Sequence, residues 1–195
     1  MSKLKVTKTS LEGVLIIEPQ CFEDGRGYFM ESYSKKDLEE IGITNDFVQE
    51  NHTFNQSIHT FRGLHFQNGN FAQARLKRVI TGSILDVVVD IRKNSPTYGK
   101  WESFVLSAEN KKQLFAPVGF AHGMLSLEEN THFVFKCDNY YDYDHFTGIR
   151  PNDLDLAIDW GIDIHHVIST KKDFELPTLI EYEFTNDFYY EELKS

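Results

Sequence analysis

Short runs of apolar and β-branched residues alternate with Gly-, Pro- and Asn-rich segments along most of the chain. The clearest run spans residues 84–91, where one face carries Leu85, Val87, Val89 and Ile91 and the other carries Ile84, Asp86, Val88 and Asp90. This period of two is typical of a β-strand rather than a helix. Many such runs, with turn signals about every 8–12 residues, predict an all-β sandwich or barrel, of which the jelly roll is one form.

The same pattern assigns most of the remaining elements. Further strands are expected at residues 13–19, 28–33, 47–52, 62–67, 101–106, 113–116, 124–127 and 133–137. Residues 75–80 and 84–91 flank Thr81-Gly82-Ser83 and predict a hairpin. Ser34 precedes a short charged run that ends at Gly42, which predicts a capped helix. Residues 1–195 are expected to form one domain with an irregular C-terminal segment from about Asp153.

The stretch from Arg62 to Gln67 has an unusual composition for a strand, because it contains an arginine and a histidine within four residues. Arginine is rarely buried unpaired and often clamps phosphate, and histidine changes its charge near neutral pH. The simpler interpretation is a surface arginine beside a core histidine. In a regular strand Arg62 and His65 face opposite ways, so they share a site only if the strand bends, or if one of them acts at an end or a subunit boundary.

Composition narrows the class of protein. Of the 195 residues, 41% are apolar and 26% are charged, which is ordinary for a soluble globular chain. No apolar stretch reaches about 18 residues and no signal-peptide pattern opens the chain, so we expect no membrane span and a cytoplasmic location. The net charge of −10 argues against nucleic acid as a partner. An anionic ligand therefore needs a local basic pocket.

Metal binding is not predicted. None of the eight histidines forms a close His-x-His pair, and Gln67 stands where a second strand ligand beside His65 would lie. What remains is a set of cations in or beside predicted strands and turns: Arg26, Arg62, Arg75, Lys77, Arg78 and His122. Converging cations could hold a diphosphate. Alternatively, Lys77 and Arg78 are solvated sheet residues, and since Arg75, Lys77 and Val79 share a face, at most some of these three point inward.

Several motifs in order resemble one known family, the dTDP-4-dehydrorhamnose 3,5-epimerases, from about Val14 to Pro177. The motifs are Asp24-x-Arg26-Gly27-x-Phe29-x-Glu31-Ser32, Phe47-Val48-Gln49-x-Asn51, Arg62-Gly63-Leu64-His65-Phe66-Gln67, Asp86-Val87-x-Val89-Asp90-Ile91-Arg92, Ser107-Ala108-Glu109-Asn110, Gly119-Phe120-Ala121-His122-Gly123 and Asn152-Asp153. Independent motifs in the right order make the resemblance specific.

The resemblance implies a cupin-type jelly-roll homodimer without metal or cofactor, and a nucleotide-diphospho-sugar with a 4-keto-hexose as substrate, most simply dTDP-linked. The implied chemistry is proton removal next to a ketone, followed by return of a proton to the opposite face. His65 matches the family's base and Asp173 matches the carboxylate that pairs with it. The positions that match substrate contacts are Arg26, Glu31, Gln49, Asn51, Arg62 and His122.

Two departures bear on the reaction. Arg75 replaces the lysine that stabilises the enolate in the family, and Phe135 replaces the tyrosine that donates a proton. We therefore hypothesise that water or a loop tyrosine such as Tyr140 returns the proton, and that the product is inverted at one carbon only. Two alternatives are a ketoisomerase of the related sugar-nucleotide cupins and a nucleotide-sugar binding protein without turnover. The ketoisomerases typically carry a second histidine at the position of Gln67.

Overall fold

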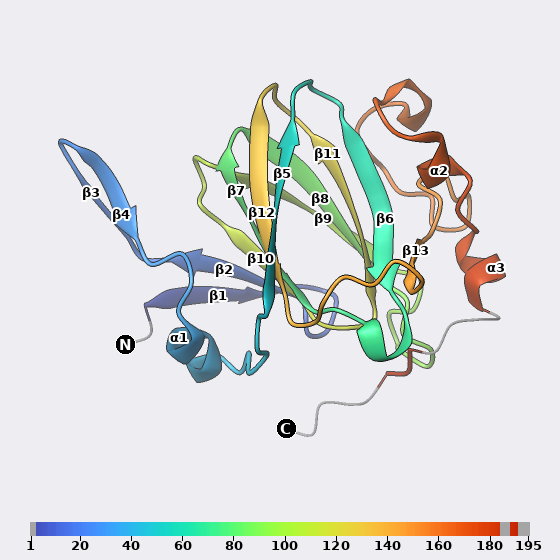
Figure 1. Ribbon diagram of the computed structural model, residues 1–195, viewed down its shortest axis with the longest axis horizontal. Helices are drawn as coiled ribbons and strands as arrows, with labels where there is room; N and C mark the ends of the chain where they lie inside the picture. The colour runs from blue at the N-terminus through green and yellow to red at the C-terminus, as the bar shows by residue number, and fades with distance from the viewer. Residues whose placement is uncertain (1–2, 184–187, 191–195) are drawn as a thin grey trace.

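The computed structural model describes residues 3–183 and 188–190. They form two antiparallel sheets packed face to face (Figure 1). The six-stranded sheet has the order β1 (Leu4–Lys8), β2 (Leu15–Pro19), β10 (Gln113–Ala116), β7 (Arg75–Thr81), β12 (Thr131–Cys137) and β5 (Gln49–Asn55). The five-stranded sheet has the order β13 (Phe146–Gly148), β6 (Phe61–Gln67), β11 (Phe120–Ser126), β8 (Ser83–Asp90) and β9 (Trp101–Ser107). The predicted all-β jelly-roll sandwich is confirmed.

Alternation on β8 divides the molecule into layers. Ile84 and Val88 face the other sheet and pack in the central core with Leu114, Met124 and Phe133. The opposite face of β8 contributes Val87 and Val89 to a second apolar cluster outside the five-stranded sheet. The predicted period of two is therefore confirmed, and each face of this strand meets a different apolar layer.

Irregular segments cover the two outer faces. The C-terminal segment contains η2 (Ile164–His166), α2 (Lys171–Phe174) and α3 (Leu179–Glu183), and it places Leu156, Trp160 and Leu179 against the five-stranded sheet. The predicted helix is α1 (Lys35–Glu40), whose Leu38 packs outside the six-stranded sheet. Ser34 caps α1, because its hydroxyl accepts a hydrogen bond from the Asp37 backbone N–H at 3.3 Å. No helix in the described ranges is both long and apolar enough to cross a bilayer.

The predicted hairpin between residues 75–80 and 84–91 is wrong. Strand β7 pairs with β10 and β12, whereas β8 pairs with β9 and β11, so the chain changes sheets at Gly82. Gly82 has a φ of +77°, and a Cβ there would overlap the side chain of Thr131. A tight corner and a hairpin turn use the same residue types, so the local pattern does not distinguish them.

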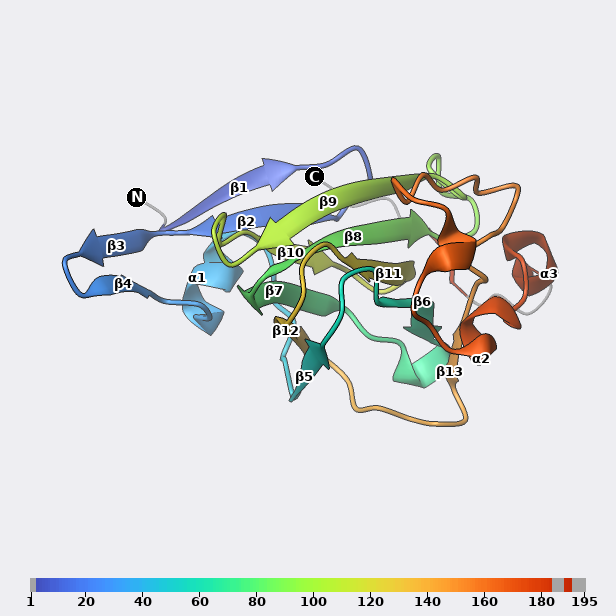
Figure 2. The same cartoon turned by 90° about the horizontal axis from the view of Figure 1, so that it is seen from above.

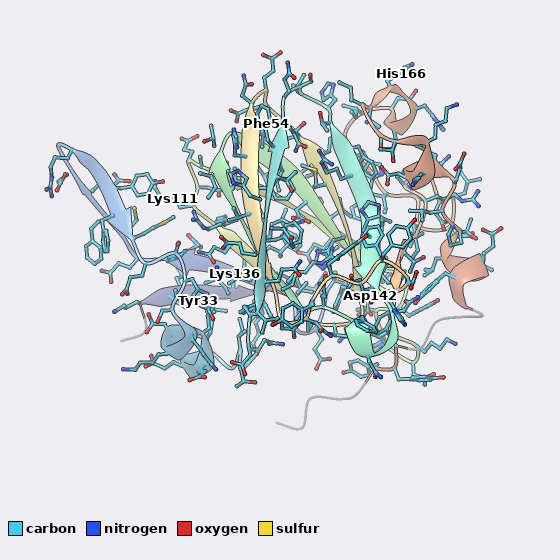
Figure 3. The ribbon with its side chains drawn as sticks, in the orientation of Figure 1. Tyr33, Phe54, Lys111, Lys136, Asp142 and His166 are labelled. Atoms are coloured by element: carbon cyan, nitrogen blue, oxygen red, sulfur yellow. The ribbon has the colours of Figure 1, made fainter. Side chains whose placement is uncertain are left out.

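A short hairpin projects from the body. Strands β3 (Cys21–Asp24) and β4 (Gly27–Met30) pair only with each other in a two-stranded sheet. Both views show the hairpin extending beyond the sandwich, at the end opposite α2 and α3 (Figures 1 and 2). Lys111 lies between hairpin and body (Figure 3), with its Nζ 3.3 Å from a Glu23 carboxylate oxygen and 4.9 Å from the Tyr28 ring centre. Phe22 and Phe29 are 56% and 66% exposed.

Candidate active site

A cavity of about 220 Å³ lies between the two sheets. The five-stranded sheet contributes Arg62, His65, His122 and Met124, and the six-stranded sheet contributes Gln49, Asn51, Thr53, Arg75, Lys77, Phe133 and Phe135. Tyr141 and Phe146 close one side. A larger adjoining cavity of about 910 Å³ shares Arg62, His65, Tyr141 and Phe146 with the first. The two together can accept a ligand longer than one sugar.

His65 and Asp173 form a hydrogen-bonded pair at the junction of the two cavities. The His65 Nε2 lies 2.8 Å from the Asp173 Oδ1, and the two side chains are 23% and 8% exposed. Residue 65 belongs to β6, whereas Asp173 lies in the first turn of α2. A bridge between Thr60 and Ile168 holds the α2 segment beside the start of β6. With Nε2–H directed at the carboxylate, Nδ1 is the imidazole nitrogen that can accept a proton.

Asp173 is held as a carboxylate by its neighbours. The Ser169 and Thr170 hydroxyls lie 2.6 and 3.2 Å from its Oδ2, and both donate to it. Burial raises the pKa of Asp173, but the hydrogen bonds from His65, Ser169 and Thr170 outweigh burial and hold this pKa below its usual range. The carboxylate therefore stays charged and fixes the imidazole tautomer.

A bulge in β6 explains how Arg62 and His65 reach the same cavity. On β11, His122 pairs with His65 and Met124 pairs with Arg62, so two steps along β11 match three along β6. The extra residue reverses the alternation, and both side chains face the second sheet. Gly63 has a φ of +135° within the bulge, and the peptide bond between Gly63 and Leu64 is cis. A Cβ on Gly63 would lie 2.5 Å from the Gly123 Cα.

Arg75 reaches the cavity. It is buried, and its guanidinium donates to the His65 carbonyl at 3.2 Å and to the Gln73 side-chain oxygen at 3.4 Å. Burial lowers the pKa of Arg75, but a guanidinium keeps its proton at neutral pH. The Phe135 ring centre lies 5.7 Å from the Arg75 Cζ. A permanent positive charge thus lies within contact distance of the strand that carries His65.

His122 lies in β11, within the wall of the smaller cavity. It is buried, and neither ring nitrogen has a hydrogen-bond partner among the residues that the structure describes. Burial, together with the positive charges of Arg75 and Lys77, lowers the pKa of His122 well below its usual value. His122 is therefore a neutral imidazole with free polar atoms in a cavity wall.

Lys77 is a lining residue that the sequence pattern did not single out from its neighbours. Its Nζ lies 2.5 Å from the Asp86 Oδ2, and the two side chains are 6% and 0% exposed. The pattern did place Lys77 on the same face of β7 as Arg75, and the structure turns both inward. A lysine in a strand is more often solvated, so only its burial distinguishes it.

Gln67 holds the loop that borders the cavity. Its side-chain nitrogen donates to the Phe71 and Tyr140 carbonyls at 2.7 and 3.0 Å, and its oxygen accepts from the Asp142 N–H at 2.8 Å. Figure 3 shows Asp142 on this loop beside the lower end of β6. Of the two loop tyrosines, Tyr141 lines both cavities, whereas Tyr140 is 63% exposed and lines neither.

Gln49 and Asn51 lie in the opposite wall, joined by a side-chain hydrogen bond of 3.1 Å. Arg26 and Glu31 line neither cavity within this chain. Arg26 is at the tip of the β3–β4 hairpin, 91% exposed and 2.6 Å from Asp24, and Glu31 pairs with Lys3. Among residues 3–183 and 188–190, no three His, Cys, Asp or Glu side chains cluster in a way that could hold a metal ion.

The fold and the site together define a jelly-roll protein with a histidine–carboxylate pair in a cavity between its sheets. A family model described as dTDP-4-dehydrorhamnose 3,5-epimerase matches residues 8–181. The chain therefore belongs to the dTDP-4-dehydrorhamnose 3,5-epimerase family, as its motifs indicated.

Individual relatives agree with this assignment. The Escherichia coli dTDP-4-dehydrorhamnose 3,5-epimerase is 46% identical over 179 residues, which cover 91% of this chain and 96% of the relative. A Legionella pneumophila 3,5-epimerase, solved with dTDP-4-keto-L-rhamnose, superposes with a TM-score of 0.91 at 38% identity, covering 96% of this chain and 99% of that one. A 3'-monoepimerase from Streptomyces bikiniensis, solved with dTDP-quinovose, gives a TM-score of 0.84 at 30% identity, with coverage of 91% and 89%.

Proposed function

We propose that this protein epimerises a dTDP-linked 4-keto-6-deoxy sugar in deoxysugar biosynthesis, at C3, at C5 or at both. The observation that carries the proposal is the His65–Asp173 pair at 2.8 Å, which faces a cavity lined by cations and amides. Such a pair removes a proton, and the surrounding positive charge stabilises the anion that results.

His65 Nδ1 accepts the proton from the carbon next to the ketone. Asp173 supports the imidazolium that forms, because its charge is held by Ser169 and Thr170. Arg75 supplies fixed positive charge for the enolate oxygen, and the neutral His122 imidazole offers a hydrogen bond to the substrate. Gln49 and Asn51 orient the sugar from the opposite wall.

The diphosphate lies toward the larger cavity. Arg62 lines both cavities and its Nε donates to Asn55 at 3.0 Å, which holds the guanidinium at the junction. Lys172 also lines the larger cavity. Two cations beside one opening suit a diphosphate, and they provide the local basic region that a chain of net charge −10 requires.

The working unit is a homodimer in this proposal. Arg26 lies in the turn of the β3–β4 hairpin, and Glu31 directly follows β4. The hairpin extends beyond the body, and its Phe22 and Phe29 side chains are exposed. A hairpin of this kind suits insertion against a second copy, where Arg26 would meet the partner's nucleotide. Residues 1–195 act as one domain, because the segment after Asp153 supplies both Asp173 and core side chains.

A cytoplasmic location accords with the free thiols of Cys21 and Cys137 and with a nucleotide-sugar substrate. A ketoisomerase is less well supported, because the Gln67 amide is used to hold the loop.

The test is incubation with dTDP-4-keto-6-deoxyglucose in heavy water, read by NMR. We expect deuterium at C3, at C5 or at both, with inversion at the exchanged carbon. His65→Asn should abolish exchange while retaining nucleotide binding. Tight binding without any exchange by the wild-type protein would instead support a binding protein. Phe135→Tyr should add exchange at a second carbon if the wild type inverts only one.

A further inference from the structure

Inversion requires a proton donor on the face of the sugar opposite His65. His65 belongs to the five-stranded sheet, so the donor is expected from the six-stranded sheet or from the loop. Among the described lining residues of the six-stranded sheet, the phenyl rings have no proton to give, and amides and threonine are too weakly acidic. The Arg75 guanidinium does not release its proton. Lys77 is the remaining group on that wall.

Lys77 is held in a position to act there. It lies on β7 two residues after Arg75 and is the register partner of Phe135 on β12. Its Nζ is 5.7 Å from the Phe133 ring centre and contacts Asp86 on β8. Lys77 lines the cavity, whereas its partner Asp86 does not.

Stability does not explain this buried pair. Replacing a buried ion pair with apolar side chains is often neutral or stabilising, because both charges lose their hydration. The Asp86 Oδ1 is buried and accepts no hydrogen bond from the described residues. Burial raises the pKa of Asp86, and the charges of Lys77 and Arg75 oppose this increase. A costly arrangement in a cavity wall fits a chemical role.

We propose that Lys77 is the catalytic acid that returns the proton on the face opposite His65, with Asp86 as the residue that positions it. The inference rests on the epimerase function proposed above. His65 takes the proton from carbon as the C–H bond breaks, and the enolate forms. Lys77 then forms the new C–H bond with one ammonium proton and becomes a neutral amine. Water removes the proton from His65 and resupplies one to Lys77, so the substrate is only isomerised.

The experiment separates exchange from inversion in heavy water. In Lys77→Met, His65 still removes the proton and can return deuterium to the same face. We expect inversion to fall at least about 100-fold, whereas deuterium incorporation with retained configuration falls less than about 10-fold. Arg78→Met is the matched control, because Arg78 lies on the same strand and lines neither cavity; both rates should stay within about twofold of wild type.

A second variant guards against misfolding. Lys77→Met leaves Asp86 buried without its partner, so the double variant Lys77→Met/Asp86→Leu is measured beside it. It should fold and give the same exchange without inversion. Equal losses of exchange and inversion in both folded variants would overturn the assignment.

Tyr141→Phe tests the loop as the alternative source of the proton. Exchange without inversion in that variant, with normal inversion in Lys77→Met, would also overturn the assignment of Lys77. A folded wild-type protein that shows no exchange would overturn the epimerase function itself. A loss of inversion that occurs only in the Lys77 variants is distinct from that result, because the wild-type protein still exchanges.

Discussion

At the scale of single residues, the proposed base His65 lies in a site with groups whose protonation state is set by burial, hydrogen bonds and neighbouring charges. Asp173 is kept anionic by three hydrogen bonds, and His122 is kept neutral by burial and two nearby cations. Each of these protonation states can be tested by replacing the side chain with an amide, which does not titrate.

Asp173→Asn removes the charge that supports the imidazolium. An amide can also hold the imidazole in the wrong tautomer, so we expect kcat to fall by about 10²–10⁴-fold. KM should change little, because Asp173 acts through His65 and not through the sugar. Ser169→Ala is a milder variant for comparison, since it removes only one of the hydrogen bonds to Asp173 and should reduce kcat far less. Unchanged kcat in Asp173→Asn would contradict the role of the pair.

His122 should make stability depend on pH. The pKa of His122 is lowered in the folded state, so as pH falls below its usual value of 6.5 the unfolded chain binds a proton that the folded chain refuses. The contribution of neutral His122 to the free energy of unfolding is therefore complete above pH 6.5. It is lost as the pH falls below 6.5, by at most about 1.4 kcal/mol per pH unit. When urea unfolding is measured between about pH 7.5 and 5, the free energy of unfolding should fall less steeply with decreasing pH in His122→Gln than in the wild type. Equal slopes in both proteins would rule this out.

At the scale of elements, the bulged strand β6 sets the geometry of the site. Gly63 approaches the β11 backbone so closely that no side chain fits without movement, and its φ of +135° is strained for any other residue. The bulge therefore depends on a residue that is not among those lining the two cavities.

Gly63→Ala should lower the free energy of unfolding by at least about 2 kcal/mol, through backbone strain and overlap with Gly123 and His122. Chemical denaturation measures this directly, and activity should fall in the protein that remains folded. Gly25→Ala is the control for stability, because no atom outside Gly25 and its two chain neighbours lies within 4 Å of the added Cβ. Similar free energies of unfolding for the two variants would contradict this prediction, because β6 would then accommodate a Cβ at position 63 without cost.

The sequence predicted elements better than their pairing. Alternation on β8 and the cap of α1 depend on neighbouring residues, so both predictions are confirmed. The corner at Gly82 was predicted as a hairpin turn, because sheet membership is set by distant partners. The pairing of His65 with Asp173 came from family resemblance and not from periodicity, since 108 positions separate them along the chain.

The pattern left the orientation of individual side chains open. From residue type alone, Lys77 could be either an inward cation or a solvated strand residue, and its contact with Asp86 on the opposing sheet shows that it is buried. Tyr140 and Tyr141 are adjacent and alike in sequence, yet only Tyr141 faces the cavities. Such choices depend on backbone direction within a loop, which residue types alone do not determine.

At the scale of the whole molecule, an acidic protein contains a small region of concentrated positive charge. Arg62, Arg75 and Lys77 lie around one cavity, whereas the net charge of the chain is −10. In the proposed homodimer, the projecting hairpin would add Arg26 from a second copy. The complete binding site would then belong to the dimer and not to either chain alone.

Shared sites predict complementation between inactive variants. Arg26→Ala and His65→Asn should each reduce activity strongly as homodimers, because each lacks one part of every site. Mixing them after dissociation should restore about a quarter of wild-type activity, since about half of the dimers are mixed and each has one intact site of two. Light scattering tests whether the protein is a dimer. No recovery in a mixture that contains mixed dimers would place Arg26 outside the partner's site.

The extra residue in β6 also bears on how such a site can originate. Along a strand, the side that a residue faces depends on whether its count from a reference position is odd or even. One inserted codon reverses this parity for every later position while the hydrogen-bonded neighbours remain in place. Arg62 and His65 are three positions apart, an odd spacing that a regular strand assigns to opposite faces. A single insertion is therefore enough to turn a cation and a base toward one substrate without a new fold.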